Sequence, residues 1–105
     1  MKVLRFKGKY KDLIISGRKR STIRMETSLN SGDLVYLEAG EERIGEAIVR
    51  EVRELSLEEL DDDLAREDGF QSVKDLIDEL TSIYGDEIFY RRLKLIKFDL
   101  IGGRD

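Results

Sequence analysis

One short cationic segment holds the residues with the clearest capacity for chemistry. Residues 17–24 read Gly-Arg-Lys-Arg-Ser-Thr-Ile-Arg, which places four basic side chains and two hydroxyl groups in eight positions. A guanidinium group can hold a phosphate or a base edge through parallel hydrogen bonds, and a hydroxyl group both donates and accepts. The segment therefore predicts a site for a nucleotide or RNA. Its candidate ligand-binding residues are Gly17, Arg18, Lys19, Arg20, Ser21, Thr22 and Arg24.

Two features of this segment also suit catalysis. Thr22 and Arg24 point to the same side of a strand, so the two side chains can converge on one ligand. Lys19 is the candidate for an activated amine, because burial among neighbouring cations would lower its pKa and make it usable as a base. A purely structural alternative stays open, in which the basic residues offset the negative end of a preceding helix.

A second group of candidates lies around Gly69. Glu67 and Asp68 follow a predicted helix that is itself very acidic, and most acids of such a helix lie on a solvated face. A helix end beside a glycine is nevertheless a good place to aim a carboxylate into a cleft. A carboxylate near Lys19 would serve as its acid–base partner, and the sequence leaves the choice between Glu67 and Asp68 open.

The composition excludes several kinds of chemistry. The chain has no Cys and no His, so it has no Ser-His or Cys-His dyad, no thiolate nucleophile and no ordinary zinc site. Catalysis would have to use Lys, Ser, Thr, Tyr, Asp or Glu, and a metal would have to be a hard ion with oxygen ligands. We expect neither a metal nor a cofactor. Abundant Lys, Arg and Glu, with one Asn and one Gln, are typical of proteins from heat-loving organisms.

The charges are unevenly distributed along the chain. Residues 1–24 contain nine basic residues and one acid, and residues 25–105 contain ten basic and 22 acidic residues. The net charge of −4 thus does not exclude a polyanionic partner, because a local patch attracts phosphate. Two alternatives are that the basic head pairs with the acidic segment 51–68 within the fold, and that the division of charge serves docking of a protein partner or self-association. The oligomeric state stays undetermined.

The length predicts a single domain over residues 1–105 with one hydrophobic core. No apolar run is long enough to span a membrane, and residues 1–4 lead into a strand-like segment rather than a signal peptide. We therefore expect a cytoplasmic protein without a membrane partner. Residues 102–105, which read Gly-Gly-Arg-Asp, are predicted to form a frayed tail.

Hydrophobic spacing predicts strands over residues 3–6, 21–25, 34–37, 43–52 and 93–101. It predicts helices from Tyr10 to a stop at Gly17, from residue 57 to about residue 68, and from residue 73 to a stop at Gly85. Ser56 with Glu59 forms a capping-box pattern, and Gly45 within a strand indicates a bulge or bend. The fold class is therefore α+β, a small curled sheet or barrel with helices at its openings.

These residues resemble the ASCH domain family over nearly the whole chain, from about Phe6 to Ile101. The most specific element is the pattern Gly-x-Lys-x-x-Thr-x-Arg, which residues 17–24 match. Weaker elements are Gly-Asp-Leu-Val at 32–35, Asp-Gly-Phe at 68–70 and Ile-Tyr-Gly at 83–85. The resemblance implies a PUA-like β-barrel with helices flanking a cleft, in a superfamily linked to RNA binding.

One bacterial branch of that family is especially similar in layout. Its members are single-domain amidohydrolases that remove the acetyl group from acetylated cytidine with a Lys, a Thr and a Glu. The resemblance places the Lys at Lys19, the Thr at Thr22, and the acid at Glu67 by residue type or Asp68 by distance from Gly-Phe. This chain departs from the branch at Arg20, where a Thr is usual; the extra charge would favour phosphorylated or polymeric ligands if it faces the site.

Three hypotheses follow from the sequence. The first is an RNA- or nucleotide-binding module that uses a cationic cleft formed by residues 17–24. The second is an amidohydrolase acting on acetylated cytidine, with Lys19, Thr22 and Glu67 or Asp68 as catalytic residues and with Arg24 or main-chain amides holding the oxyanion. The third is a protein–protein interaction domain. The first is favoured because it needs only the cationic segment and the fold.

Overall fold

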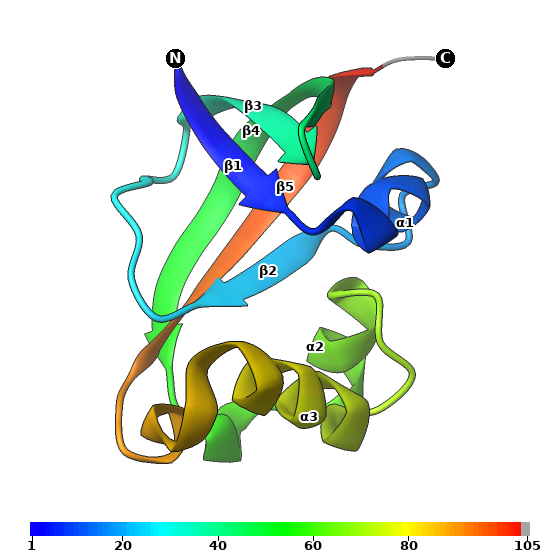
Figure 1. The fold of residues 1–105 in the computed structure, drawn as a ribbon. Coiled ribbons are helices and arrows are strands. Elements are labelled where there is room, and N and C mark those ends of the chain that lie inside the picture. The colour runs from blue at the N-terminus through cyan, green and yellow to red at the C-terminus, as the bar shows by residue number, and fades with distance from the viewer. Residues whose placement is uncertain (104–105) are drawn as a thin grey trace.

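The computed structural model of the protein describes residues 1–103, which form a curled five-stranded sheet with helices grouped along one side and one end (Figure 1). The strands are β1 Lys2–Phe6, β2 Ser21–Arg24, β3 Leu34–Ala39, β4 Glu42–Leu55 and β5 Leu93–Gly103. The helices are α1 Lys11–Ile15, α2 Asp62–Glu67 and α3 Val73–Tyr84. Short 3-10 turns cover Gly8–Tyr10, Leu57–Glu59 and Gly85–Phe89.

The strand order β1-β3-β4-β5-β2 leaves β1 and β2 at the two edges of the sheet. β1 pairs with β3 in parallel, and the other neighbouring strands are antiparallel. The sheet curls but does not close, since β1 and β2 do not pair with each other. The side chain of Arg24 on β2 bridges the two edges, with Nη2 lying 2.6 Å from the main-chain oxygen of Arg5 on β1. This mixed, half-barrel sheet with flanking helices confirms the predicted α+β class.

A bulge at the predicted place helps the sheet to curl. Leu37 pairs with Gly45 and Glu38 pairs with Arg43, which leaves Ile44 as an extra residue on β4. The side chain of Ile44 is fully buried, so the bulge turns an apolar side chain into the core rather than out of it. The prediction of a bulge or bend at Gly45 is confirmed.

Strand β5 separates two hydrophobic cores. Ile96 and Phe98 face the inside of the curled sheet, whereas Leu93 and Leu95 face the helices. Alternate residues of a strand point to opposite faces, so β5 is buried on both sides. Burying a side chain such as Phe98 contributes about 1.5–3 kcal/mol, and β5 therefore holds the sheet and helix layers together.

The predicted helix from residue 57 to residue 68 is wrong in its continuity. The oxygen Oε2 of Glu59 accepts a hydrogen bond of 2.6 Å from the main-chain nitrogen of Ser56, as the capping box requires, but it caps one 3-10 turn only. Leu60 is extended, and Asp61 then caps a separate helix, α2, by accepting from the nitrogen of Leu64 at 2.8 Å. A second capping residue inside the acidic run thus divides the helix.

The predicted tail at residues 102–105 begins within a strand. Gly102 and Gly103 continue β5, opposite Glu46 and Gly45 on β4. The other residues of the predicted tail, 104 and 105, lie outside the described residues. Within residues 1–103, no helix has the length and apolar character needed to cross a membrane.

Candidate functional site

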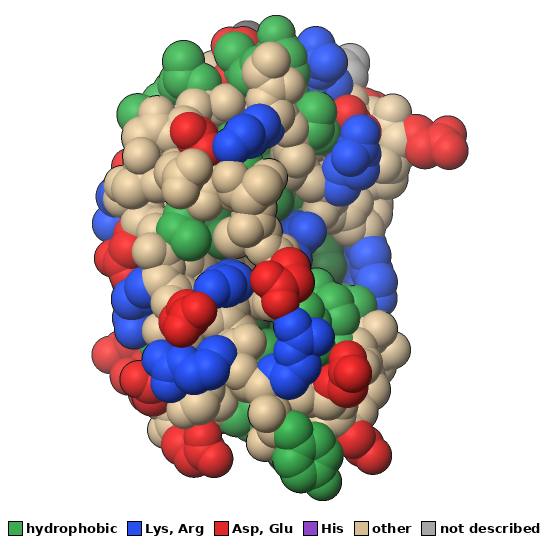
Figure 2. Space-filling view, turned by 90° about the vertical axis from the view of Figure 1, so that its left-hand side faces the viewer, with side chains coloured by type: hydrophobic (Ala, Val, Ile, Leu, Met, Phe, Trp, Pro, Cys, Tyr) green, Lys and Arg blue, Asp and Glu red, His purple; other side chains and the backbone are tan. Residues whose placement is uncertain are grey.

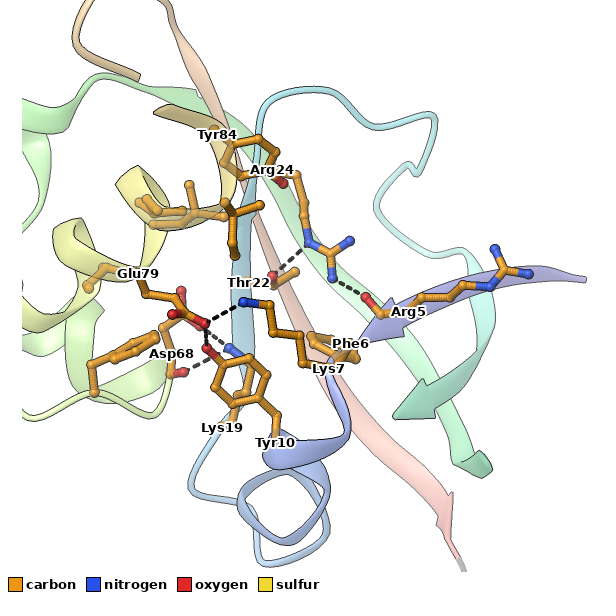
Figure 3. A pocket seen from close by; sticks show the side chains of 15 residues that line it. Arg5, Phe6, Lys7, Tyr10, Lys19, Thr22, Arg24, Asp68, Glu79 and Tyr84 are labelled. Atoms are coloured by element: carbon orange, nitrogen blue, oxygen red, sulfur yellow. Dashed lines mark hydrogen bonds and ion pairs between the residues drawn. The ribbon is translucent and has the colours of Figure 1, made fainter. Parts of the chain in front are cut away.

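A pocket of about 200 Å³ lies where the edge strands β1 and β2 meet, with α3 and the residues after α2 closing it (Figure 3). Lys19, Thr22, Arg24 and Asp68 contribute its polar groups, together with Glu79 from α3. Apolar and aromatic side chains complete the walls. They include Phe6, Tyr10, Phe70, Leu76, Leu80, Ile83 and Tyr84.

The turn after α1 places Lys19 in the pocket. Gly17 ends the helix with a φ of 81°, a conformation that glycine adopts without strain, and the nitrogens of Arg18 and Lys19 both donate to the carbonyl oxygen of Leu13 at 2.9 Å. The chain therefore reverses sharply and leaves Lys19 only 3% exposed. Its Nζ donates to the main-chain oxygen of Asp68 at 2.8 Å and to the Asp68 carboxylate.

Three aromatic rings surround the amine of Lys19. Its Nζ lies 4.7 Å from the ring centroid of Tyr10, 5.6 Å from that of Phe6 and 5.7 Å from that of Phe70. The face of an aromatic ring attracts a cation at such distances. The rings and the Asp68 carboxylate thus replace the water that a lysine ammonium normally holds.

Burial moves both members of the Lys19–Asp68 pair toward their neutral forms. It lowers the pKa of Lys19, against the attraction and hydrogen bonding of Asp68. It raises the pKa of Asp68 to about 6, although Lys19 and then Arg24 act in the opposite direction. A proton on this pair is therefore held less firmly by the amine, and more firmly by the carboxyl group, than in water.

Arg24 orients the hydroxyl group of Thr22. Nε of Arg24 donates to Oγ1 of Thr22 at 2.9 Å, while Nη2 reaches the carbonyl oxygen of Arg5 (Figure 3). A guanidinium group can only donate, so Oγ1 is the acceptor and the hydroxyl hydrogen of Thr22 is left to point elsewhere. Burial lowers the pKa of Arg24, and its ring contact with Phe6, 5.1 Å from the centroid, supports the cation.

Several polar residues of the pocket were not predicted from the sequence, namely Arg5, Lys7, Tyr10 and Glu79. The carboxylate of Glu79 accepts a hydrogen bond from the hydroxyl of Tyr10 and forms ion pairs with Lys9 at 3.0 Å and Lys7 at 3.5 Å. The hydrogen bond from Tyr10 and the charges of the two lysines lower the pKa of Glu79. Burial raises the pKa of Tyr10, and the hydrogen bond and charge of Glu79 raise it further. Glu79 lies on the helix face that the apolar spacing marks only as core, so no local pattern identifies it.

Of the two candidate acids, Asp68 lines the pocket and Glu67 does not. Asp68 is 3% exposed and contacts Lys19, whereas Oε2 of Glu67 forms an ion pair with Nζ of Lys97 at 3.2 Å. Gly69 follows with a φ of 93°, and a Cβ atom added at this position would lie beside Leu13 and the side chain of Lys19. Glu67 and Asp68 are successive residues at the end of α2 with helical backbone angles, so their side chains point about 100° apart and reach different places.

The cationic segment is not one continuous wall, because its side chains divide between two sides. Lys19, Thr22 and Arg24 line the pocket. Gly17, Arg18 and Arg20 line a separate hollow on the other side. Ser21 is completely buried opposite Lys97 of β5, and its hydroxyl has no hydrogen-bond partner among the described residues. The predicted binding residues therefore belong to at least two environments.

The basic head of the chain is mostly neutralised within the fold, but not by the segment expected. Lys2 pairs with Asp33, Arg5 with Glu38 and Lys11 with Glu42, while Lys7 and Lys9 pair with Glu79. Lys19 is the one basic residue of the head that pairs with segment 51–68 among the described residues. Basic and acidic side chains are likewise interspersed on the face shown in Figure 2. The alternative in which the basic head pairs with segment 51–68 is therefore wrong for most of the head.

Comparison with known proteins identifies the fold. No protein-family sequence model matches the chain, and no curated protein matches it. Among solved structures, a protein of Enterococcus faecalis V583 from family DUF984 is 16% identical, with a TM-score of 0.79 over 91% of this chain and 69% of the other. An ASCH domain of Lactobacillus crispatus JV V101 is 17% identical, with a TM-score of 0.74 over 88% and 70%.

A third neighbour is a mutant form of ZmASCH from Zymomonas mobilis, which is 15% identical with a TM-score of 0.67 over 97% of this chain and 71% of the other. The curled sheet, the helices at its side and the pocket between the edge strands define a PUA-like α+β protein. Within that class, the chain has the fold of ASCH domain structures. The resemblance seen in the sequence is confirmed at the level of the fold.

Proposed function

We propose that this protein binds a nucleoside or nucleotide, either free or within RNA, with its base in the pocket of Lys19, Thr22 and Asp68. The observation that supports this most strongly is the convergence of these three polar residues, each no more than 5% exposed, in one hollow. Buried polar groups are costly unless they have partners, and a cleft that gathers several of them is the usual location of a ligand site.

The size and lining of the pocket favour a base over a phosphate. Its volume of about 200 Å³ is below the range of about 300–1,000 Å³ common for drug-sized ligands, so a small planar group fits best. The rings of Tyr10 and Phe70 offer stacking faces, and the carboxylate of Glu79 offers an acceptor for an amino group. Two cations of the pocket are already compensated, since Lys19 pairs with Asp68 and Lys7 pairs with Glu79. The guanidinium group of Arg24 already donates to Thr22 and to the main-chain oxygen of Arg5. A phosphate group would therefore gain little electrostatic attraction in the pocket.

The test is binding of cytidine and the other ribonucleosides, followed by NMR chemical shifts of the pocket residues. We expect saturable shifts at Tyr10 and Phe70 in the wild type and their loss in Thr22→Ala. We expect the same loss in Lys19→Ala. Lys74→Ala is its matched control, because the side chain of Lys74 is 83% exposed and lies on the outside of α3. A pocket that binds no nucleoside, nucleotide or short RNA would contradict the proposal.

A second candidate function is hydrolysis of the acetyl group of acetylated cytidine, as the resemblance implies. The observation that favours it is the contact of Lys19 with Asp68 in the pocket that Thr22 also lines. Arg24 fixes Oγ1 of Thr22 and leaves its hydrogen available, and burial lowers the pKa of Lys19. An amine of lowered pKa can accept the hydroxyl proton as a general base.

The corresponding reaction has two balanced steps. Oγ1 of Thr22 attacks the acetyl carbonyl while neutral Lys19 takes its proton, and the protonated Lys19 then gives that proton to the departing amine, which leaves an acetyl ester on Thr22. Water next attacks the ester with Lys19 as base, and the proton returns to Oγ1 as acetate departs. Asp68 orients Lys19, and Arg24 lies beside the reacting oxygen.

Acetate release from acetylated cytidine at several temperatures tests this activity. We expect release to be lost in Lys19→Ala and Thr22→Ala and reduced at least about tenfold in Asp68→Asn. Glu67→Gln is the matched control, since Glu67 is adjacent in sequence but pairs with Lys97 outside the pocket. Nucleoside binding without acetate release would leave the first proposal and exclude the second.

A further inference from the structure

A second hollow lies on the other side of the segment that carries Lys19. Its volume is about 460 Å³, and it is formed by the turn after α1, the end of α2 and the loop that follows α2. Figure 1 shows these parts of the chain next to one another. We call it the arginine groove. Its lining residues are Gly17, Arg18, Arg20, Arg66, Gly69, Phe70 and Gln71.

Arg18 and Arg20 differ from the other basic residues in lacking internal partners. Among residues 1–103, neither side chain forms an ion pair or a hydrogen bond, and both are exposed. The other Lys and Arg side chains of this range all form an ion pair, a hydrogen bond or a ring contact. The positive charge of Arg18 and Arg20 is therefore free to attract an anion.

Arg66 adds a third guanidinium group to the groove. It pairs with Asp63 one helical turn earlier, at 2.5 Å, but the Arg66 and Asp63 side chains are 59% and 88% exposed. Solvent screens such a pair, so it competes weakly with a ligand that contacts several arginines at once. Arginine is also the side chain best suited to phosphate, because its planar fork donates two parallel hydrogen bonds.

The backbone holds Arg18 and Arg20 in fixed places. The nitrogen of Arg18 donates to the oxygen of Leu13 at 2.9 Å, and the nitrogen of Arg20 donates to the oxygen of Glu67 at 2.7 Å. The oxygen of Arg20 accepts from the nitrogen of Phe98 at 3.0 Å. The main-chain N–H groups of both arginines are thus already used, so an anion in the groove would be held by the guanidinium groups.

The groove and the pocket share one wall. Phe70 lines both, and Gly69 lines the groove directly after Asp68, which lines the pocket. A ligand can therefore place one part on each side of Phe70. The charges of the two hollows differ, because Lys19 in the pocket is paired with Asp68, whereas Arg18 and Arg20 in the groove have no partner among residues 1–103.

We propose that the arginine groove binds backbone phosphates of a single-stranded RNA that has one base in the pocket. This proposal rests on the proposed nucleoside-binding function for the placement of the base, but not for the anion site itself. It assigns the two sides of residues 17–24 different tasks. The pocket side recognises a base, and the groove side supplies the electrostatic attraction and its dependence on salt.

The test measures binding of a fluorescent oligocytidine RNA by anisotropy over a series of NaCl concentrations. We expect the double variant Arg18→Ala/Arg20→Ala to bind at least about tenfold more weakly at low salt, with a salt slope that is smaller by about 1.4, since each phosphate contact on single strands contributes about 0.7. The control is Arg53→Ala/Lys74→Ala, which removes the same charge from partly or largely exposed ion pairs elsewhere. Equal losses of RNA affinity in the two double variants, or no loss in Arg18→Ala/Arg20→Ala, would overturn the proposal that the groove binds RNA.

Two further measurements separate this proposal from the function on which it rests. Cytidine binding followed by NMR reports the pocket alone, and Thr22→Ala should remove it while the salt slope for RNA persists. If no nucleoside binds but the arginine variant still loses RNA, the proposed function fails and the groove stands. Pyrophosphate tests the other source of phosphate: displacement of the RNA by pyrophosphate at equal concentration would show a site for a free phosphate compound and would overturn the RNA assignment.

Discussion

The amine of Lys19 donates hydrogen bonds to both the main-chain oxygen and the carboxylate of Asp68, 49 positions further along the chain. The contact joins the turn after α1 to the end of α2 and places a nearly inaccessible ion pair beside the pocket. A buried pair of this kind contributes little net stability, because desolvation of both groups offsets their attraction. The pair as a whole therefore adds little to stability, although removing either partner alone leaves a buried charge without its counterion.

The first prediction concerns the stability of that pair. Lys19→Met should lower the free energy of unfolding at neutral pH by about 3–5 kcal/mol, since it leaves the Asp68 carboxylate buried without its cation. Adding Asp68→Leu should recover most of the loss. Urea unfolding at constant pH measures both changes. A double variant no more stable than Lys19→Met would show that packing, and not the unpaired carboxylate, caused the loss.

The second prediction is a dependence of stability on pH. Because burial raises the pKa of Asp68 to about 6, the folded state favours the protonated carboxyl group more than the unfolded state does. This group therefore stabilises the fold below its unfolded pKa of roughly 4, and its contribution is lost as the pH rises through about 6. Relative to Asp68→Asn, the wild type should lose up to roughly 3 kcal/mol between these limits.

The measurement for this prediction is the difference in unfolding free energy between the wild type and Asp68→Asn at each pH. Other carboxylates titrate in both proteins and cancel in the difference. A difference that stays constant, or one in which the wild type gains stability as the pH rises, would show that the pair with Lys19 outweighs burial.

The sequence was informative where chemistry depends on local spacing. Lys19 and Thr22 were predicted from the pattern of residues 17–24, and the structure brings both to one pocket. The sequence did not reveal Glu79, because its approach to Tyr10 depends on how α3 packs against the turn after β1. It also left the choice between Glu67 and Asp68 unresolved, since which of the two faces the pocket depends on how the end of α2 packs against Lys19 and Lys97.

The cationic segment could be predicted only in part. Alternation along β2 correctly placed Thr22 and Arg24 on one side. Residues 18–20 precede β2, which begins at Ser21, so the alternation of the strand does not extend to them. Arg18 and Arg20 lie in the groove while Lys19 lies in the pocket. Such a division depends on tertiary hydrogen bonds, such as that from Arg20 to Glu67, which no local pattern encodes.

The third prediction compares two glycines with the same backbone angle. Gly69 and Gly32 both have a φ of 93°, but an added Cβ at Gly69 would lie 3.3 Å from Leu13 Cδ1 and 3.4 Å from Lys19 Cβ, whereas at Gly32 it would meet nothing within 4 Å. Gly32→Ala should therefore cost about 1–2 kcal/mol from backbone strain alone. Gly69→Ala should cost more by about 1 kcal/mol, because it also crowds the side chain of Lys19.

Thermal or urea unfolding of both glycine variants gives this difference, and cytidine binding provides a second readout. Only Gly69→Ala should weaken nucleoside binding, because Gly32 lies in the loop before β3 and does not line the pocket. Equal destabilisation of the two variants would mean that the contact of residue 69 with Lys19 is loose enough to accommodate a methyl group.

The fourth prediction concerns the closure of the sheet by Arg24. Its guanidinium group spans from the hydroxyl of Thr22 to the main-chain oxygen of Arg5 and so links the two edge strands. A lysine amine at this position cannot reproduce the planar fork. Arg24→Lys should therefore speed amide hydrogen exchange in β1 and β2 by about tenfold, relative to little change in β4 and β5.

Arg53→Lys is the control, because Arg53 pairs with Glu51 on the same strand and links no edges. Faster exchange across the whole sheet in Arg24→Lys would indicate global destabilisation, and no change would show that the edges stay together without this link.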